Sequence, residues 1–410
     1  MLDVETIKAS GLCSGCGLCA GIGEGDRPAI VMKDAANGYR RPVVTEPVPE
    51  EQARRIDEVC PGANIVHGAE GEDAPDYHPV WGPVQTARLG WSSNAALRRN
   101  ASSGGGLSAL LTHLLATGEI DYVVQVSAAP DLPLRNMTRV STGAEDVFAS
   151  AGSRYAPSSP LEDIERHLAG HSRFAFVGKP CDVAGLRQLA RIDPRVDEKV
   201  AYMFAFMCAG VPSHHGTSAL LREMGIACDD EVTSFRYRGD GWPGFATAAT
   251  ASGETHRMDY DSSWGGVLNR YLQFRCKICP DGIGEFADVV CADGWYLDEA
   301  NAPIFDERGG RSIILSRNAK GEALVQSAER AGALQTQPVT IEEIAAMQPY
   351  QARRKGLTGA RLTAMALLGR RRPRYRGLAL AENMKRLGPA KALRELLGTL
   401  RRLLRGQGRE

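Results

Sequence analysis

The sequence lacks the features of a membrane-spanning or secreted chain. No apolar run among the 410 residues approaches the roughly 18 residues that suggest a transmembrane helix. The first residues, MLDVETIKASGLC, lack the basic and then apolar pattern of a signal peptide. Ten cysteines are too few for a disulfide scaffold of this length, and several are spaced like metal ligands. These absences predict a cytoplasmic protein that binds metal.

Two common catalytic signatures are also missing. No G-x-G-x-x-G motif follows a predicted strand, which argues against an ordinary Rossmann dinucleotide site. No nucleophile, histidine and acid are spaced as a hydrolytic triad, and no carboxylate pair is placed for general acid–base catalysis. His214 and His215 are adjacent in a Ser-containing loop, where such a pair more often faces solvent than binds metal.

Net charge is absent overall but strongly divided along the chain. The 49 Lys and Arg residues balance 49 Asp and Glu residues. Residues 350–410 contain 17 basic and 3 acidic residues, a net charge of +14. Residues 1–349 contain the other 32 basic and 46 acidic residues, a net charge of −14. We expect the basic tail to pack on the acidic body, to touch an anionic membrane surface, or to bind a partner subunit.

Leucines within the tail recur at helical spacing with arginines between them, which predicts a basic amphipathic helix. These leucines are Leu393, Leu396, Leu397, Leu400, Leu403 and Leu404.

Composition and predicted secondary structure divide the chain into four parts. Residues 1–68 form a small cysteine-rich unit, and residues 69–80 are acidic and rich in Gly and Pro, as is typical of a linker. In residues 81–348, predicted helices alternate with predicted strands, which is typical of an α/β fold with α+β elements and a mixed sheet. Residues 349–410 form the basic helical tail. A helix is predicted over 106–117, and strands over 121–126, 173–177, 201–207, 287–290 and 311–316.

The densest cysteine motif lies in the first unit. Cys13, Cys16 and Cys19 form a C-x2-C-x2-C run, and Cys60 is followed directly by a proline. Two-residue spacers let consecutive sulfurs converge on one side of the backbone, and a distant Cys-Pro can close a ferredoxin-type [4Fe–4S] site. Zinc is the alternative, although zinc favours two pairs of ligands. We therefore predict that residues 1–68 are a small ferredoxin-like domain with one cluster.

A second set of thiols lies in the α/β region. Cys276 and Cys279 form another C-x2-C, and Cys181 and Cys208 each follow a predicted strand. Functional groups of α/β sheets gather at strand ends, so these four thiolates could hold a second [4Fe–4S] cluster. The alternative is that they are buried apolar cysteines, a common fate of free thiols. The remaining cysteines have no companions and are interpreted as structural: Cys228 and Cys291.

Three loops resemble segments that bind phosphates or flavins. SSGGG (residues 102–106) precedes the predicted helix, where backbone N–H groups and the helix dipole favour an anion. GSRY (152–155) and YRGDGWPG (237–244) place arginine beside aromatic residues, and could contact a flavin ring or its phosphate. Lys179 is a cation beside Cys181 that could face a phosphate or a reduced flavin. Taken singly, each loop is also typical of an ordinary turn.

Together these motifs resemble the family of coenzyme F420 hydrogenase/dehydrogenase beta subunits. The matching segments, among them GKPCD, CAGVPS and CKIC, run in order over about residues 10–300. The family includes beta subunits of F420-reducing hydrogenases and formate dehydrogenases, and ferredoxin-dependent reductases of 7-hydroxymethyl chlorophyll a and divinyl chlorophyllide. The chlorophyll-pathway members carry a longer first cysteine segment with a nearby Ala-Cys element, which this sequence lacks.

The resemblance implies an iron–sulfur flavoprotein oxidoreductase with two [4Fe–4S] clusters and FAD in a flavin-binding domain. The ligands that it implies are Cys13, Cys16, Cys19 and Cys60 for the first cluster, and Cys181, Cys208, Cys276 and Cys279 for the second. The flavin contacts that it implies are Ser103, Gly104, Gly105, Ser153, Arg154, Lys179, Arg238 and Asp293.

These features predict an enzyme that passes electrons through its clusters and FAD to or from a deazaflavin such as F420 or another small-molecule acceptor. Clusters carry one electron at a time, whereas a flavin stores two, which is a physical reason to combine them. One alternative is a non-catalytic subunit that relays electrons between a ferredoxin-like donor and a partner enzyme, in an oligomer or complex. Another is a zinc-stabilised binding protein without redox function.

Overall fold

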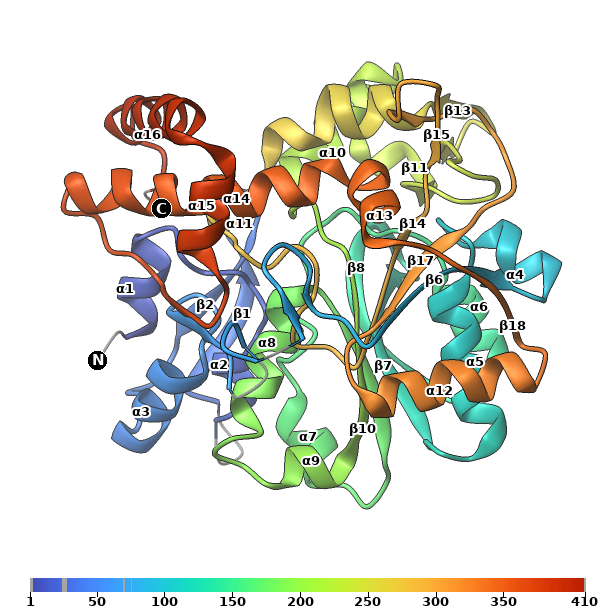
Figure 1. The fold of residues 1–410 in the computed structure, drawn as a ribbon, viewed down its shortest axis with the longest axis horizontal. Coiled ribbons are helices and arrows are strands. Elements are labelled where there is room, and N and C mark those ends of the chain that lie inside the picture. The colour runs from blue at the N-terminus through green and yellow to red at the C-terminus, as the bar shows by residue number, and fades with distance from the viewer. Residues whose placement is uncertain (1–2, 24–27, 69–70, 75, 409–410) are drawn as a thin grey trace.

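The fold of the chain, in a computed structural model, is built around an eight-stranded mixed sheet (Figure 1). The structure describes residues 3–23, 28–68, 71–74 and 76–408. The inner strands of the sheet, β14, β10, β9 and β7, run parallel, and antiparallel strands flank them on both sides. In spatial order the strands are β18 (Leu334–Pro338), β6 (Thr86–Ser92), β17 (Ser312–Ser316), β14 (Val289–Asp293), β10 (Val200–Phe206), β9 (Phe174–Gly178), β7 (Tyr122–Ala129) and β8 (Leu132–Ser141). The chain therefore has the predicted mixed α/β fold.

Both faces of the parallel strands are buried, which explains their nearly continuous apolar sequences. Phe174 and Phe176 of β9 point into one hydrophobic core, together with α8 (Pro180–Leu189). Ala175 and Val177 point into a second core, together with α5 (Gly106–Thr117) and α12 (Ala319–Arg330). The predicted helix over 106–117 and the predicted strands over 121–126, 173–177 and 201–207 are confirmed.

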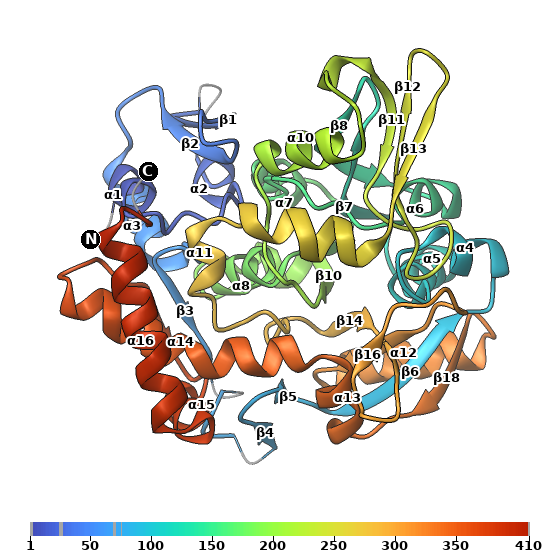
Figure 2. The ribbon, with the colours of Figure 1, turned by 90° about the horizontal axis from the view of Figure 1, so that it is seen from above.

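Smaller elements surround this sheet. A three-stranded antiparallel sheet comprises β11 (Val232–Arg236), β12 (Ala246–Thr250) and β13 (Thr255–Met258). In Figure 2 it lies to the right of α10 (His214–Glu223). Short hairpins are formed by β4 (Tyr77–His78) with β5 (Gly82–Pro83), and by β15 (Tyr296–Leu297) with β16 (Pro303–Ile304). Further short helices are α4 (Ala95–Asn100), α6 (Ala144–Ser150), α7 (Ile164–Leu168), α9 (Arg195–Lys199), α11 (Phe274–Lys277) and α13 (Ile341–Met347).

The first and last parts of the chain lie side by side in both ribbon views (Figures 1 and 2). Strand β3 (Asn64–Val66) pairs in parallel with β19 (Arg374–Arg376). The other N-terminal elements are α1 (Val4–Ala9), α2 (Leu18–Gly21), β1 (Ile30–Asp34), β2 (Arg40–Val44) and α3 (Glu50–Val59). The other C-terminal elements are α14 (Pro349–Leu367), α15 (Leu380–Leu387) and α16 (Pro389–Leu404). The basic tail thus packs on the body of the protein.

A buried charged group fastens α14 to the body. Lys355 Nζ lies 2.6 Å from Glu285 Oε1, and His67 Nε2 lies 3.2 Å from Glu285 Oε2. Tyr77, inside the predicted linker, donates its hydroxyl to the same carboxylate at 2.6 Å. Burial alone would raise the pKa of Glu285, but Lys355 and His67 lower it to about 2. The carboxylate therefore stays ionised and joins three distant parts of the chain.

Within the described residues, no helix is both long enough and apolar enough to cross a membrane.

Candidate functional site

Four cysteines of the first unit line one small cavity: Cys13, Cys16, Cys19 and Cys60. Three of them come from the loop that leads into α2 and from its first turn, and the fourth lies at the C-terminal end of α3. Gly15 and Gly17 have φ angles of 77° and 87°, a backbone conformation that glycine adopts without strain, so the loop can turn between the cysteines. The apolar residues of the wall are Leu18, Met32, Ile56 and Val59.

The electrostatics of this cavity disfavour four free thiolates. Burial and the neighbouring Cys13 thiol raise the pKa of Cys60 to about 11. Burial also raises the pKa of Cys16 and Cys19, and nearby thiols add to it. Four thiolates can share this space only with compensating positive charge, which bound metal supplies. The donor set therefore fits an iron–sulfur cluster.

The arrangement differs from that of a site for a single ion. Among the described residues, no group of three or more His, Cys, Asp or Glu side chains is arranged to hold one metal ion. In a four-iron cluster each thiolate binds a separate iron atom, so the sulfurs stand farther apart than the ligands of one zinc ion. Four thiols around a closed cavity fit the larger group.

The structure also brings the second set of thiols together. Cys181 lies in α8 directly after β9, and Cys208 follows β10, so both stand at the carboxyl ends of parallel strands. Cys276 lies in α11, and Cys279 follows it. Burial and then the Cys276 thiol raise the pKa of Cys208 to about 12, with a further contribution from Cys279. Here, too, the thiols are close enough to need compensating charge.

A buried guanidinium group adjoins this second set. Arg275 is 2% exposed, and its Nη2 donates to the carbonyl oxygen of Pro61 at 2.7 Å. Its Nε and Nη1 have no hydrogen-bond partner among the described residues. Buried donors are seldom left unpaired in native structures, so these two fit an anionic group among the thiols.

A single side chain spans the two sets of thiols. Gln273 Nε2 donates to the Ser14 carbonyl oxygen at 3.2 Å and lies 3.5 Å from Cys276 Sγ. Ser14 is in the loop between Cys13 and Cys16. Gln273 is 3% exposed, so this contact between the two sets is shielded from water.

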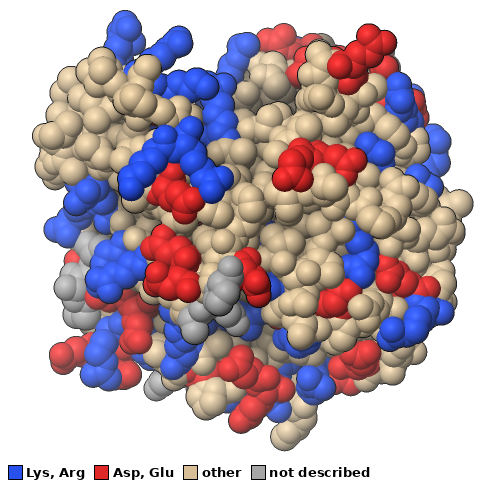
Figure 3. Space-filling view, in the orientation of Figure 1, with Lys and Arg blue, Asp and Glu red and all other residues tan. Residues whose placement is uncertain are grey.

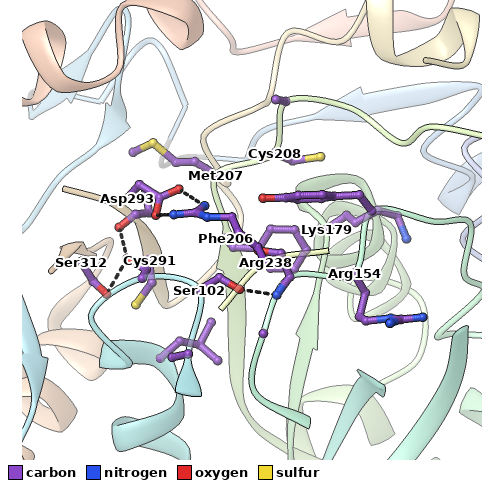
Figure 4. A pocket seen from close by; sticks show the side chains of 18 of the residues that line it. Ser102, Arg154, Lys179, Phe206, Met207, Cys208, Arg238, Cys291, Asp293 and Ser312 are labelled. Carbon is purple, nitrogen blue, oxygen red and sulfur yellow. Dashed lines mark hydrogen bonds and ion pairs between the residues drawn. The ribbon is translucent and has the colours of Figure 1, made fainter. Parts of the chain in front are cut away.

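A cavity of about 430 Å³ lies beside the second set of thiols (Figure 4). Its volume is within the range of small-molecule pockets in proteins, about 300–1,000 Å³. Cys208 lines the cavity and so connects it with the second set. Seven of the residues implied as flavin contacts line it: Ser103, Gly105, Ser153, Arg154, Lys179, Arg238 and Asp293. Aromatic residues form another part of the wall: Tyr155, Tyr260, Trp264, Trp295, Phe305 and Tyr350.

Gly104 is the implied flavin contact that is not in the cavity wall. A Cβ atom at this position would lie 2.6 Å from the Gly90 carbonyl oxygen and 2.7 Å from the Arg311 Cα. The Gly104 amide instead donates to Ser312 Oγ at 3.0 Å. Close packing of the loop against β6 and β17 therefore accounts for this glycine.

Arg154 lines the cavity, but its guanidinium group is already used. It donates to the carbonyl oxygens of Pro133, Arg135 and Phe235 at 2.8, 3.0 and 3.3 Å, and to Asn136 Oδ1 at 2.8 Å. In Figure 4 this group points away from Arg238 and Asp293. Arg154 therefore holds the loop in place and is not a free cation for a phosphate.

Arg238 and Asp293 form a two-pronged ion pair in the wall, with N–O distances of 2.8 and 2.7 Å (Figure 4). Trp242 Nε1 also donates to Asp293 at 3.0 Å. The Arg238 guanidinium lies 4.6 Å from the Tyr260 ring centre and 5.1 Å from the Trp295 ring centre. The pair thus orders the aromatic part of the wall.

Lys179 is the cation between the second set of thiols and the cavity. Its Nζ lies 2.8 Å from Asp182 Oδ2 and 3.2 Å from Ser158 Oγ. Burial alone would lower the pKa of Lys179, but Asp182, Cys181 and Cys208 raise it above its usual value. The ammonium group therefore keeps its positive charge at this end of the cavity.

Two expectations for single residues are wrong. Cys228 is exposed, so it is not a structural core cysteine, because the preceding helix ends before it and leaves it in a surface turn. His214 is buried at the start of α10, and burial followed by the charge of Arg135 lowers its pKa to about 4. His215 is exposed, as predicted.

Cys291 is buried on β14 and also lines the large cavity. Its isolated place in the sequence did not indicate a position beside the cavity.

Comparisons with known proteins agree with this architecture. Residues 87–164 match the family model described as coenzyme F420 hydrogenase/dehydrogenase, beta subunit N-term, and residues 171–342 match the model of its C terminus. The coenzyme F420 hydrogenase subunit beta of Methanococcus voltae is 26% identical over 271 residues, 63% of this chain and 86% of that protein. The beta subunit of F420-dependent formate dehydrogenase 1 of Methanococcus maripaludis is 23% identical over 246 residues, 60% of this chain and 59% of that protein.

A solved structure shows the same fold. It belongs to the F420-reducing [NiFe] hydrogenase complex of Methanosarcina barkeri, in a xenon derivative. The matched chain is 18% identical with a TM-score of 0.55, and the match covers 71% of this chain and 95% of that one.

The fold and the site define a mixed α/β protein with two sets of four thiols, the first around a small cavity and the second beside a large one. The chain belongs to the family of coenzyme F420 hydrogenase/dehydrogenase beta subunits. Its relatives are subunits of F420-linked oxidoreductases, so its class of function is electron-transferring oxidation and reduction.

Proposed function

We propose that this chain is an oxidoreductase that uses two [4Fe–4S] clusters and FAD to move electrons to or from a small-molecule acceptor. The first cluster would be held by Cys13, Cys16, Cys19 and Cys60. The second would be held by Cys181, Cys208, Cys276 and Cys279. One observation carries the proposal: Gln273 contacts both Ser14 in the wall of the small cavity and Cys276 of the second set, and Cys208 of that set lines the large cavity. Such an order suits a relay.

The residues of the large cavity suit FAD. Ser103, Gly105 and Ser153 present small side chains to the cavity, and aromatic rings form another part of its wall. A bound flavin would convert one-electron transfer from the clusters into two-electron transfer to the acceptor. Lys179 keeps a positive charge near the thiols, which would favour negative charge on a reduced group in the cavity.

A deazaflavin such as F420 is the acceptor that we favour, because the relatives that match this chain are F420-linked proteins. A planar ring would pack against the aromatic part of the wall, which the Arg238–Asp293 pair holds in place. We place the chain in a reducing compartment such as the cytoplasm, because none of its ten cysteines, all of which the structure describes, forms a disulfide.

A second candidate is a non-catalytic subunit that relays electrons between a ferredoxin-like donor and a partner enzyme. The exposed side of α16 favours it. Leu393, Leu397 and Leu404 are 58%, 56% and 75% exposed and lie on one side of the helix. Lys and Arg side chains gather around the C-terminal helices in Figure 3. We propose that an acidic redox partner binds this apolar and basic surface, because its charge would complement the Lys and Arg side chains.

Turnover by the isolated chain distinguishes the two candidates. The purified, cofactor-containing chain would be mixed anaerobically with a chemically reduced one-electron donor and oxidised F420, and the absorbance of F420 would be followed. Reduction of F420 without any other protein supports the enzyme. Reduction that occurs only after a partner subunit is added supports the relay.

A further inference from the structure

The C-terminal segment closes over the second set of thiols. We propose that Arg354 of α14 raises the reduction potential of the second cluster by placing a buried positive charge beside its thiolates. This inference rests on the proposed function, because it requires a cluster at the second set. Arg354 lies beyond residue 342, where the match to the family models ends.

The contacts of Arg354 place it directly on the loops that carry the thiols. Its Nη1 donates to the Cys208 carbonyl oxygen at 2.7 Å, and its Nη2 donates to the Cys276 carbonyl oxygen at 2.9 Å. Its Nε is buried and has no hydrogen-bond partner among the described residues. The side chain is 4% exposed, so water does not screen its charge.

Other side chains of the same segment also bind carbonyl groups of these loops. Gln351 Nε2 donates to the Cys208 carbonyl oxygen at 3.3 Å, and Thr358 Oγ1 donates to that of Cys279 at 3.4 Å. Tyr375 donates its hydroxyl to the Ile278 carbonyl oxygen at 3.2 Å, and Arg361 donates to that of Lys277. The loop from Cys276 to Cys279 is therefore held from outside by one continuous segment of the chain.

The position of the charge determines the direction of its effect. A four-iron cluster with four thiolates is an anion, and reduction adds one more negative charge. A nearby cation in a poorly screened site stabilises the reduced form more than the oxidised form. Arg354 therefore makes the second cluster easier to reduce, and it acts less on the first cluster, whose cavity it does not line.

The test is an anaerobic redox titration of the full-length, cofactor-containing protein, with the EPR signals of the two reduced clusters followed separately. In Arg354→Gln the midpoint potential of one cluster becomes more negative. A tenfold fall in the ratio of reduced to oxidised cluster at a fixed potential corresponds to about 59 mV for one electron. Arg354→Lys keeps the positive charge and shifts the potential less.

Arg353→Gln is the matched control, because Arg353 is the preceding residue of α14 and is exposed. It removes the same charge from the helix and leaves both potentials unchanged. An unchanged potential in Arg354→Gln overturns the inference. If Arg354→Gln fails to retain the second cluster, Arg354→Lys decides. A retained cluster whose potential shifts by less than the about 59 mV of a tenfold change supports a charge effect. A larger shift, or loss of the cluster there too, overturns it. Absence of a second cluster in the unaltered chain contradicts the proposed function itself.

Discussion

Gln273 donates a hydrogen bond to Ser14 across 259 positions of sequence, at 3.2 Å. The same amide nitrogen lies 3.5 Å from Cys276 Sγ, so one side chain contacts the first cysteine loop and a thiol of the second set. Arg41 Nη1 donates to the Gln273 Oε1 at 3.1 Å and fixes the orientation of the amide. Electron transfer between the proposed clusters would take this short, dry route.

We predict that Gln273→Leu both destabilises the protein and slows electron transfer. The substitution removes the hydrogen bond from the buried amide to the Ser14 carbonyl oxygen, and leaving that acceptor unsatisfied costs about 1–3 kcal/mol of unfolding free energy. Stopped-flow absorbance after mixing with a reduced one-electron donor would show slower reduction of the flavin. Asn383→Leu is the control, because Asn383 is also a buried amide and donates to the Pro79 carbonyl oxygen at 2.7 Å, and neither residue lines either cavity. Equal flavin reduction rates in the two variants would contradict the proposed route.

The buried ion pair between Lys355 and Glu285 should dominate the attachment of α14. Lys355→Met removes the ammonium group and leaves the buried carboxylate with His67 and Tyr77 alone, and removing one partner of a buried pair typically costs about 3–5 kcal/mol. Denaturant unfolding would measure this loss. Arg353→Met, an exposed change on the same helix, should stay within about 0.5 kcal/mol of the unaltered chain. A similarly small loss in Lys355→Met would mean that the ion pair does not hold the segment.

The same carboxylate predicts a pH dependence of stability. The pKa of Glu285 falls from 4.5 to about 2 on folding, because Lys355 and His67 outweigh the effect of burial. A lowered folded-state pKa stabilises the protein above the unfolded pKa, and this stabilisation is lost as the pH falls from about 4.5 towards 2. Glu285→Gln should therefore show a smaller loss of unfolding free energy across this range. Parallel curves for the two proteins would contradict the assignment.

Lys179 should contribute to retention of the flavin. Lys179→Met combined with Asp182→Asn removes the positive charge from the end of the large cavity nearest the second set of thiols, without leaving the buried Asp182 carboxylate unpaired. The loss of one charge-assisted contact of about 1.5–3 kcal/mol corresponds to roughly 10- to 100-fold weaker binding. Fluorescence of released FAD, titrated against the purified protein, would measure it. Lys33→Met, an exposed change on β1, is the control and should bind FAD as the unaltered chain does.

The exposed leucines of α16 should matter for docking and little for stability. Leu397→Asp places a charge on the solvent side of the helix, whereas Leu403 is 1% exposed and packs into the core. We expect Leu397→Asp to weaken binding of an acidic ferredoxin about tenfold in a sedimentation or calorimetric assay, and to change the melting temperature only slightly. Binding of the unaltered chain to vesicles with anionic lipids, but not to the ferredoxin, would instead assign this surface to a membrane.

Periodicity was sufficient to predict the central fold, because burial on both faces produces continuous apolar strands. Cys181 and Cys208 could likewise be placed together from sequence, since the carboxyl ends of the parallel strands β9 and β10 lie at the same edge. Both predictions depend on local patterns that repeat over a few residues.

Contacts between distant segments could not be predicted in this way. Arg154 was implied as a flavin contact, but four acceptors from β8 and β11 occupy its donors, and no local pattern indicates which acceptors a guanidinium group will meet. Arg354 and Gln273 were missed because neither belongs to a motif. A signal was nevertheless present for Gln273, which lies three residues before Cys276 and thus close to a thiol.

The most direct test of the account is the cofactor content of the chain after anaerobic purification, with iron, sulfide, zinc and FAD quantified and a visible spectrum recorded. The account predicts about eight iron and eight sulfide per chain, from two clusters of four, together with about one FAD. About four iron would restrict the cluster to one set of thiols, and Cys16→Ser against Cys181→Ser would show which. Zinc without flavin would contradict the oxidoreductase account.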